Sequence, residues 1–235
     1  MKKLFLVFAL VLSLIFVSCS QDDRISRESY DIMYAHLSQM WAQSLAHTDA
    51  ETAFFGDSRV AGADWYSAYP EEKVINLGVG GDKIGNLITR LDQVKTLAES
   101  GNLKRCLVAI GGNDGLSSKF NSDKFKEEYD SLLAQLSELG ITVYVNTIAG
   151  VTSEDTPVSA NDAKKANSKI EQANAIIREL AANHDVVCIE IAALMDNEDG
   201  SLKGSLKKEY ASSDGVHFSE EGNQIWFDTL RPYFE

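Results

Sequence analysis

Four short polar clusters contain the residue types that acyl transfer by a serine requires; three directly follow runs of apolar residues, and the fourth comes one loop after such a run. The first is Gly56-Asp57-Ser58, which ends the apolar part of FFGDSR abruptly. The others lie at residues 78–82 (GVGGD), 111–114 (GGND) and 214–217 (DGVH). Gly, Asp and Ser all favour turns, so a turn explains any one cluster. A turn does not explain why Ser, Asn, Asp and His all occur, and this set predicts a serine nucleophile with a base and an acid.

Ser58 is the candidate nucleophile, and His217 and Asp214 are the candidates for activating it. A serine hydroxyl is a weak nucleophile until a base takes its proton, and histidine is the side chain best suited to this near neutral pH. The chain has four histidines, and only His217 follows the last predicted strand at the edge where we expect Ser58. Asp214 lies three positions upstream, and Gly215 makes the tight turn between them easy. Asp214 is therefore expected to hold the imidazole in its catalytic tautomer.

The oxyanion that forms during acyl transfer needs hydrogen-bond donors. The sequence offers the backbone N–H of Ser58, a backbone N–H of a glycine in the second cluster, and the side-chain amide of Asn113. Asp57 is assigned to capping the turn that holds Ser58 and is left out of the catalytic set.

Five short apolar, β-branched or aromatic runs precede or contain these clusters and predict the strands that position them. They are TAFFGDS, KVINLGVGG, RCLVAIGGND, TVYVNTIAG and VVCIEIAAL. Helical patterns lie between most of them, at residues 84–98, 123–139 and 163–183, and a last helix is expected at 219–230. Apolar strands separated by helices predict a parallel sheet covered on both faces, a three-layer α/β/α sandwich. Ligands bind beyond the carboxyl ends of such strands, which is where the four clusters fall.

In this order the blocks FFGDSR, NLGVGGD, GGND and DGVHFS resemble the GDSL esterase/lipase family, also called the SGNH hydrolases. The resemblance covers about residues 52–235 and matches the family's oxyanion-hole glycine to Gly81. It implies a five-stranded parallel, flavodoxin-like sheet and ester hydrolysis without a metal or cofactor. One departure is Arg59, which stands where the name-giving motif has leucine, and which either touches substrate or pairs with an acid.

The N-terminus predicts an export signal, not a part of the fold. Lys2 and Lys3 precede the apolar residues 4–17, and Ser18-Cys19-Ser20 follow, the pattern of a secretory signal. FVSC resembles the bacterial lipobox, with Phe16 where leucine is usual, which makes Cys19 the expected lipidated residue. CSQDD resembles the acidic signal that sends some lipoproteins to the outer cell surface. We therefore expect a signal peptide at 1–18, a tether and N-terminal helix at 19–50, a hydrolase domain at 51–235, and a lipid-anchored protein of the outer membrane, surface-exposed or periplasmic.

Composition limits the partners. The net charge of −13 argues against nucleic acid and against anionic membrane surfaces, so membrane contact is expected only through the lipid anchor. The sequence leaves the oligomeric state open. Cys106 and Cys188 are expected as buried thiols, and they are too far apart for a disulfide if another strand lies between them. The N-terminal helix is expected to pack on the domain through one amphipathic face, formed by Ile32, Leu37, Met40, Trp41 and Leu45.

Substrate specificity in this architecture is expected to come from the loops after the strands. Residues 150–165 are polar and acidic, unlike the apolar lid of a lipase, which favours small acyl esters and, by family analogy, acetyl groups on glycans. Trp65, Tyr66 and Tyr69 either stack on substrate or pack their loop onto the domain, and we favour packing. The alternatives are a lysophospholipase-like esterase, an acyl transferase, and a surface lipoprotein that binds a ligand without turnover.

Overall fold

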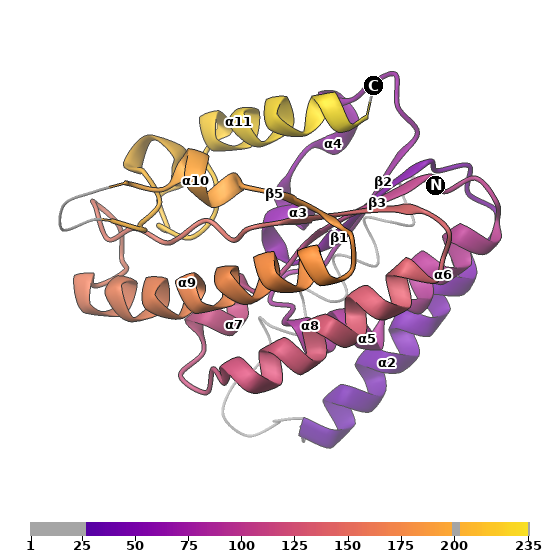
Figure 1. Cartoon of the computed structure of the whole chain (residues 1–235), viewed down its shortest axis with the longest axis horizontal. Helices are drawn as coiled ribbons and strands as arrows, with labels where there is room; N and C mark the ends of the chain where they lie inside the picture. Colours follow the sequence, from indigo (N-terminus) through magenta and orange to yellow (C-terminus); the bar gives the residue numbers. More distant parts are fainter. Residues whose placement is uncertain (1–26, 199–202, 235) are drawn as a thin grey trace.

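The computed structural model describes residues 27–198 and 203–234, which form a five-stranded parallel sheet between two layers of helices (Figure 1). The strand order is β2-β1-β3-β4-β5, the flavodoxin-like order, which confirms the predicted three-layer α/β/α sandwich. The strands are β1 (Thr52–Gly56), β2 (Val74–Gly78), β3 (Arg105–Ala109), β4 (Thr142–Asn146) and β5 (Val187–Ile189). The signal peptide expected at 1–18 and Cys19 lie outside the described residues.

The two faces of the sheet carry separate cores because side chains alternate along each strand. On β1, Ala53 and Phe55 face one core and Phe54 faces the other. The first core is covered by α2 (Arg27–Ser44), α5 (Ile84–Thr89), α6 (Asp92–Glu99), α8 (Ser122–Ser137) and α9 (Ala160–Asn183). The second is covered by α3 (Ser58–Gly62), α4 (Trp65–Ala68), α10 (Ile191–Met195) and α11 (Glu220–Leu230). Shorter elements are α7 (Gly112–Leu116), η2 (Lys208–Tyr210) and η3 (Arg231–Tyr233).

The carboxyl ends of the central strands are level, which brings the loops after them to one edge. Gly56 at the end of β1 pairs with Gly78 on β2 and with Ala109 on β3. Helix α3 crosses so close to Gly78 that a Cβ there would lie 2.2 Å from the Ala61 nitrogen. Only glycine fits such a contact, so the small residues at the strand ends let α3 start against the sheet.

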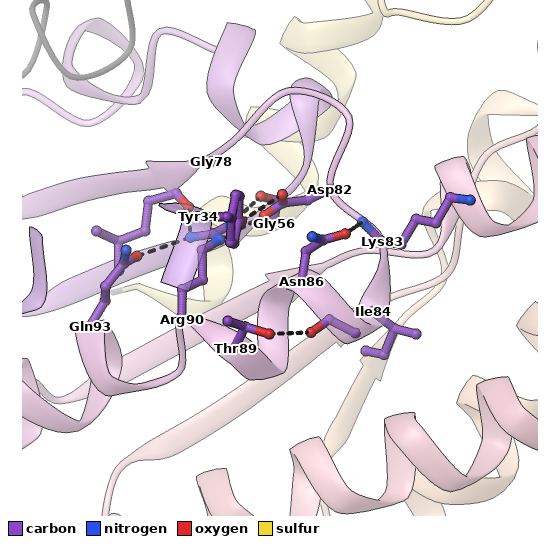
Figure 2. Close-up of polar contacts among 12 residues, drawn as sticks. Tyr34, Gly56, Gly78, Asp82, Lys83, Ile84, Asn86, Thr89, Arg90 and Gln93 are labelled. Atoms are coloured by element: carbon purple, nitrogen blue, oxygen red, sulfur yellow. Dashed lines mark hydrogen bonds and ion pairs between the residues drawn. The ribbon is translucent and has the colours of Figure 1, made fainter. Parts of the chain in front are cut away.

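One predicted helix is wrong. The pattern at 84–98 forms two helices, α5 and α6, separated at Arg90 and Leu91. Arg90 leaves helical geometry, with φ −111° and ψ 18°, and its side chain is buried under the sheet edge (Figure 2). The apolar periodicity continues across the break, because Leu87, Leu91 and Val94 all face the core, so the pattern alone does not reveal it.

The predicted face of the N-terminal helix is wrong in part. Ile32 and Met40 are exposed, at 65% and 46%, although Trp41 and Leu45 are buried as expected. The buried face of α2 consists of Tyr34, Ser38, Trp41, Ala42 and Leu45. Two of these are polar, so a search for apolar residues misses them. With Trp41 and Leu45 in the first core, α2 is part of the packed fold.

The two cysteines of the described residues are unpaired, and β4 lies between their strands. Cys106 on β3 is buried, but Cys188 on the edge strand β5 is only half-buried, which corrects the expectation of two buried thiols. Burial raises the pKa of Cys106 to about 12 and that of Cys188 to about 11. Within residues 27–198 and 203–234, no helix combines the length and apolarity needed to cross a bilayer.

Candidate active site

Ser58 is the first residue of α3 and follows β1 after a single residue, Asp57. The Asp57 carboxylate caps the helix, since its Oδ1 accepts a hydrogen bond of 2.9 Å from the backbone N–H of Arg59. This confirms the expected capping role. Burial raises the pKa of Asp57, and the charge and N–H of Arg59 oppose the rise. The candidate nucleophile is therefore mounted on a rigid junction, with its own N–H at a helix N-terminus.

His217 lies between Ser58 and Asp214. Its Nε2 is 2.8 Å from Ser58 Oγ, and its Nδ1 is 2.5 Å from Asp214 Oδ2. The other oxygen of Asp214 accepts hydrogen bonds from the backbone of Val216 and His217 and from the Ser212 hydroxyl. Partial burial acts to raise the pKa of Asp214, but these hydrogen bonds outweigh it and hold the pKa far below its ordinary value. Asp214 is thus ionised and can accept the Nδ1 proton.

The turn that carries His217 is fixed on both sides. Gly215 has a φ of 75°, and its carbonyl accepts a hydrogen bond from the Thr152 backbone in the loop after β4. A Cβ on Gly215 would lie 2.4 Å from the Thr152 oxygen. Ser219 caps α11, with its hydroxyl accepting from the Gly222 N–H at 3.1 Å. His217 is therefore held between the β4 loop and the start of a helix.

Asn113 and Ser58 line one small hollow, which we call the Ser58 pocket. The Asn113 side-chain amide donates one hydrogen bond of 2.9 Å to the backbone carbonyl of Asp82, which leaves its second N–H for a ligand. Residues 79–82, the oxyanion loop, contain the candidate donor Gly81, whose φ is 82°. A Cβ on its neighbour Gly80 would lie 3.9 Å from the Cβ of Ser58, the candidate nucleophile. Gly81 is not among the residues that line the Ser58 pocket.

The guanidinium of Arg59 binds backbone carbonyls, and Arg59 also lines the Ser58 pocket. Its guanidinium donates to the backbone carbonyls of Val216, Ala149 and Gly150, at 2.7–3.1 Å. It also lies 4.7 Å from the centre of the Phe218 ring. Burial lowers its pKa, and the carboxylates of Asp57, Asp196 and Asp214 oppose this. The residue after the nucleophile thus joins α3 to the loop that carries His217, a contact that sequence reasoning missed.

Two of the three aromatic residues that follow Ser58, Trp65 and Tyr69, pack onto the domain as favoured, and Tyr66 does not. Trp65 is buried and stacked on Phe54, with ring centres 3.7 Å apart. Tyr69 is buried and donates from its hydroxyl to the Phe227 carbonyl at 2.6 Å. Tyr66 alone among the three is exposed, at 47%. Among the described residues, no group of three or more His, Cys, Asp or Glu side chains is placed to hold a metal ion.

A model of the GDSL-like Lipase/Acylhydrolase family matches residues 54–225, a span that contains every catalytic candidate. The chain therefore belongs to the GDSL-like lipase/acylhydrolase family, as the resemblance indicated, and it is a carboxylic ester hydrolase. A search of curated proteins returned no match.

Solved structures show the same fold at low sequence identity. A structure from Streptococcus pneumonia described as a platelet activating factor is 20% identical, with a TM-score of 0.72 over 88% of this chain and 96% of its own. A GDSL-like lipase from Bacteroides thetaiotaomicron VPI-5482 is 19% identical, with a TM-score of 0.70 over 86% and 98% of the two chains. An acetyl xylan esterase is 22% identical, with a TM-score of 0.61 over 78% and 99%. At these identities the likeness establishes the fold alone.

Proposed function

We propose that this protein is a serine esterase that removes short acyl groups, acetyl above all, from carbohydrate. The observation that carries the catalytic part is the continuous line of contacts from Ser58 through His217 to Asp214. Each contact falls within hydrogen-bond range, so the nucleophile, base and acid are already aligned.

The proposed reaction has two halves. Ser58 Oγ attacks the ester carbonyl while its proton passes to His217 Nε2, and Asp214 stabilises the imidazolium that results. The ester C–O bond then breaks, His217 returns the proton to the leaving alcohol, and an acyl-serine remains. Water attacks the acyl-serine with His217 again as the base, which releases the carboxylic acid and restores Ser58. The N–H groups of Ser58 and Gly81 and the Asn113 amide stabilise the oxyanion in both halves.

The surroundings of Ser58 support a short acyl group. The Ser58 pocket is lined by a few apolar side chains, Leu116, Val151, Ile170 and Val216, and it is small. A lipase for long chains needs an extended apolar surface for its substrate, whereas here the loop after β4 has the polar sequence TSEDTPVSAND.

A polar groove next to the oxyanion loop supports a carbohydrate alcohol. It lies among α2, α5, α7 and α8 and is lined by Lys83, Asn86, Asp114, Asn121 and Lys124, among others. Lys83 and Asp114 directly follow Asp82 and Asn113, so the groove adjoins the proposed oxyanion hole. One structural neighbour is an acetyl xylan esterase, an enzyme of the proposed class.

Hydrolysis of p-nitrophenyl acetate and p-nitrophenyl octanoate by the whole chain in mild detergent tests the proposal, beside Ser58→Ala. We expect turnover of acetate to exceed that of octanoate and to fall at least about 10³-fold in the variant, because the nucleophile is lost. Release of acetate from acetylated xylan tests the carbohydrate part. Preference for octanoate would support a lysophospholipase-like enzyme, and wild-type rates no higher than those of Ser58→Ala would contradict the catalytic role of Ser58. Added alcohol acceptors distinguish transfer from hydrolysis.

We also propose that Cys19 is lipidated and anchors the protein in the bacterial outer membrane. The support is the sequence pattern around Cys19. Incorporation of labelled palmitate by the wild type but not by Cys19→Ser would agree with the proposal, and equal labelling of both would refute it.

A further inference from the structure

Helix α2 reaches the oxyanion loop through one hydrogen bond. The Tyr34 hydroxyl donates to Asp82 Oδ1 at 2.7 Å, across 48 positions of sequence (Figure 2). Both side chains are 3% exposed, so the bond is shielded from water. Tyr34 also lies outside residues 54–225, the part of the chain that matches the family model.

Asp82 connects the parts of the proposed oxyanion hole. It directly follows Gly81, and its carbonyl accepts the hydrogen bond from the Asn113 amide. Its backbone N–H donates to the Val79 carbonyl at 3.3 Å and closes the loop on itself. A shift of Asp82 would therefore move both Gly81 and the Asn113 side chain.

Arg90 extends the connection to the strand that carries the nucleophile. Its Nε donates to Asp82 Oδ2 at 2.7 Å, and its two remaining nitrogens donate to the carbonyls of Leu77 and Gly56. The arginine is 1% exposed and also lies 4.5 Å from the centre of the Phe55 ring. The ends of β1 and β2 and the oxyanion loop are thus joined by one buried cation.

We propose that Tyr34 is a positioning residue for the oxyanion hole, and that α2 is thereby a working part of the active site. Tyr34 fixes the carboxylate of Asp82 from the side that Arg90 does not reach, and Asp82 in turn fixes Gly81 and Asn113. The inference rests on the proposed role of these two residues as oxyanion donors.

The chemistry of the contact explains why one hydroxyl matters. A buried carboxylate needs donors for its oxygens, and a bond between a hydroxyl and an ionised carboxylate is among the stronger hydrogen bonds. Without the Tyr34 hydroxyl, only Oδ2 of Asp82 keeps its donor, the Arg90 guanidinium. The carboxylate is then expected to move toward Arg90 or toward water. Oxyanion donors act only when placed to within about 0.5 Å, so a small movement of the loop lowers the rate.

The test compares Tyr34→Phe with Tyr69→Phe in the whole chain. Tyr69 is a matched control, since it is also buried and also loses one hydrogen bond, to the carbonyl of Phe227 in α11. With p-nitrophenyl acetate we expect Tyr34→Phe to lower kcat about 10-fold relative to Tyr69→Phe, with KM changed less than 2-fold. This is a part of the 10²–10³-fold cost of removing a donor outright. If Tyr34 had a purely structural role, kcat would fall by the same factor in both variants.

Hydrogen exchange provides a second readout that does not depend on activity. The amides of Val79 and Asp82 bond to the carbonyls of Gly56 and Val79, so their exchange reports on the oxyanion loop. We expect faster exchange there in Tyr34→Phe than in Tyr69→Phe. Equal kcat in the two variants would overturn the positioning role. If the wild type hydrolysed no ester, the proposed function would fail separately, and equal exchange in both variants would then overturn the coupling.

Discussion

At the scale of single residues, Arg59 links the segments that carry the candidate nucleophile and the candidate base. Arg59 is one residue from Ser58, and its carbonyl partner Val216 is one residue from His217. The guanidinium binds three carbonyls at once because its five N–H donors form a rigid planar fork. A single side chain thus connects the start of α3 to the loop that carries His217.

We predict that Arg59→Lys lowers kcat of ester hydrolysis about 10-fold or more and lowers the melting temperature. An ammonium group is a compact donor that cannot match the planar fork, so at least one buried carbonyl loses its partner at a cost of about 1–3 kcal/mol. Arg178→Lys is the control, because Arg178 pairs with Glu190 on the exposed surface. Steady-state kinetics and thermal unfolding of both variants check this, and wild-type kcat in Arg59→Lys would show that the contact does not position His217.

Ser58, Asp214 and His217 could be predicted because the signals that reveal them lie within short stretches of sequence. Ser58 lies in a short block directly after β1, and Asp214 and His217 lie three positions apart in a second short block between η2 and α11. Arg59 and Tyr34 were not predictable in the same way, because their partners lie 157 and 48 positions away. Such contacts depend on how the loops pack. Arg59 lies in the FFGDSR block, but nothing in that block indicates Val216 as its partner, and Tyr34 lies in none of the four blocks.

At the scale of elements, the turn at residues 214–217 shows how backbone geometry controls the site. Gly215 combines a left-handed φ with close contact to the β4 loop. We predict that Gly215→Ala lowers kcat at least about 10-fold, because the added Cβ both strains the backbone and displaces the Thr152 carbonyl. Kinetics with p-nitrophenyl acetate measure the effect.

Gly140→Ala separates the two causes in that prediction. Gly140 also has a positive φ, of 68°, but a Cβ there would meet nothing within 4 Å. It lies in the turn before β4, at the opposite edge of the sheet from the site. We expect a loss of stability in both variants and a loss of kcat only in Gly215→Ala. An equal loss of kcat in both would mean that backbone strain alone lowers activity.

The elements themselves were largely predictable, because alternating strands and helices leave distinct patterns. All five strands form where the apolar runs are, and the predicted apolar residues of α8, including Phe125, Tyr129 and Leu132, are buried. The break between α5 and α6 was missed because it arises from Arg90, whose burial depends on Asp82. The face of α2 was misassigned because Tyr34 and Ser38 are buried polar residues. Sequence patterns fail where polar side chains turn inward.

At the scale of the whole molecule, buried carboxyl groups make stability depend on pH. Burial raises the pKa of Asp114 to about 7, although the hydrogen bond from the Ile84 N–H and the charge of Lys83 act to lower it. Burial also raises the pKa of Asp196 to about 7. In the unfolded chain an aspartate loses its proton near pH 4. Between about pH 4 and pH 7 the unfolded chain therefore binds fewer protons than the folded one, so stability falls as the pH rises through this range.

We predict that Asp114→Asn removes part of this decline. The variant should melt about 2–4 °C above the wild type at pH 8, where Asp114 is ionised, and within about 1 °C of it at pH 5. Melting temperatures between pH 5 and pH 8 check this. Asp228→Asn, which removes a charge from an exposed side chain, is the control and should show no such pH-dependent gain. Parallel curves for wild type and Asp114→Asn would exclude Asp114 as a source of the pH dependence.

The direction of α2 determines which edge of the sheet lies nearest to the proposed lipid anchor. Because α2 ends before the start of β1 and Tyr34 meets Asp82 at the carboxyl edge, the helix begins on the same side as Ser58. Arg27 follows Cys19 by eight positions. A segment of this length extends to no more than about 28 Å. If Cys19 is acylated as proposed, this length would keep the start of α2, and with it the edge that carries Ser58, close to the bilayer. The esters within reach would then be those carried to, or displayed close to, the cell's own surface.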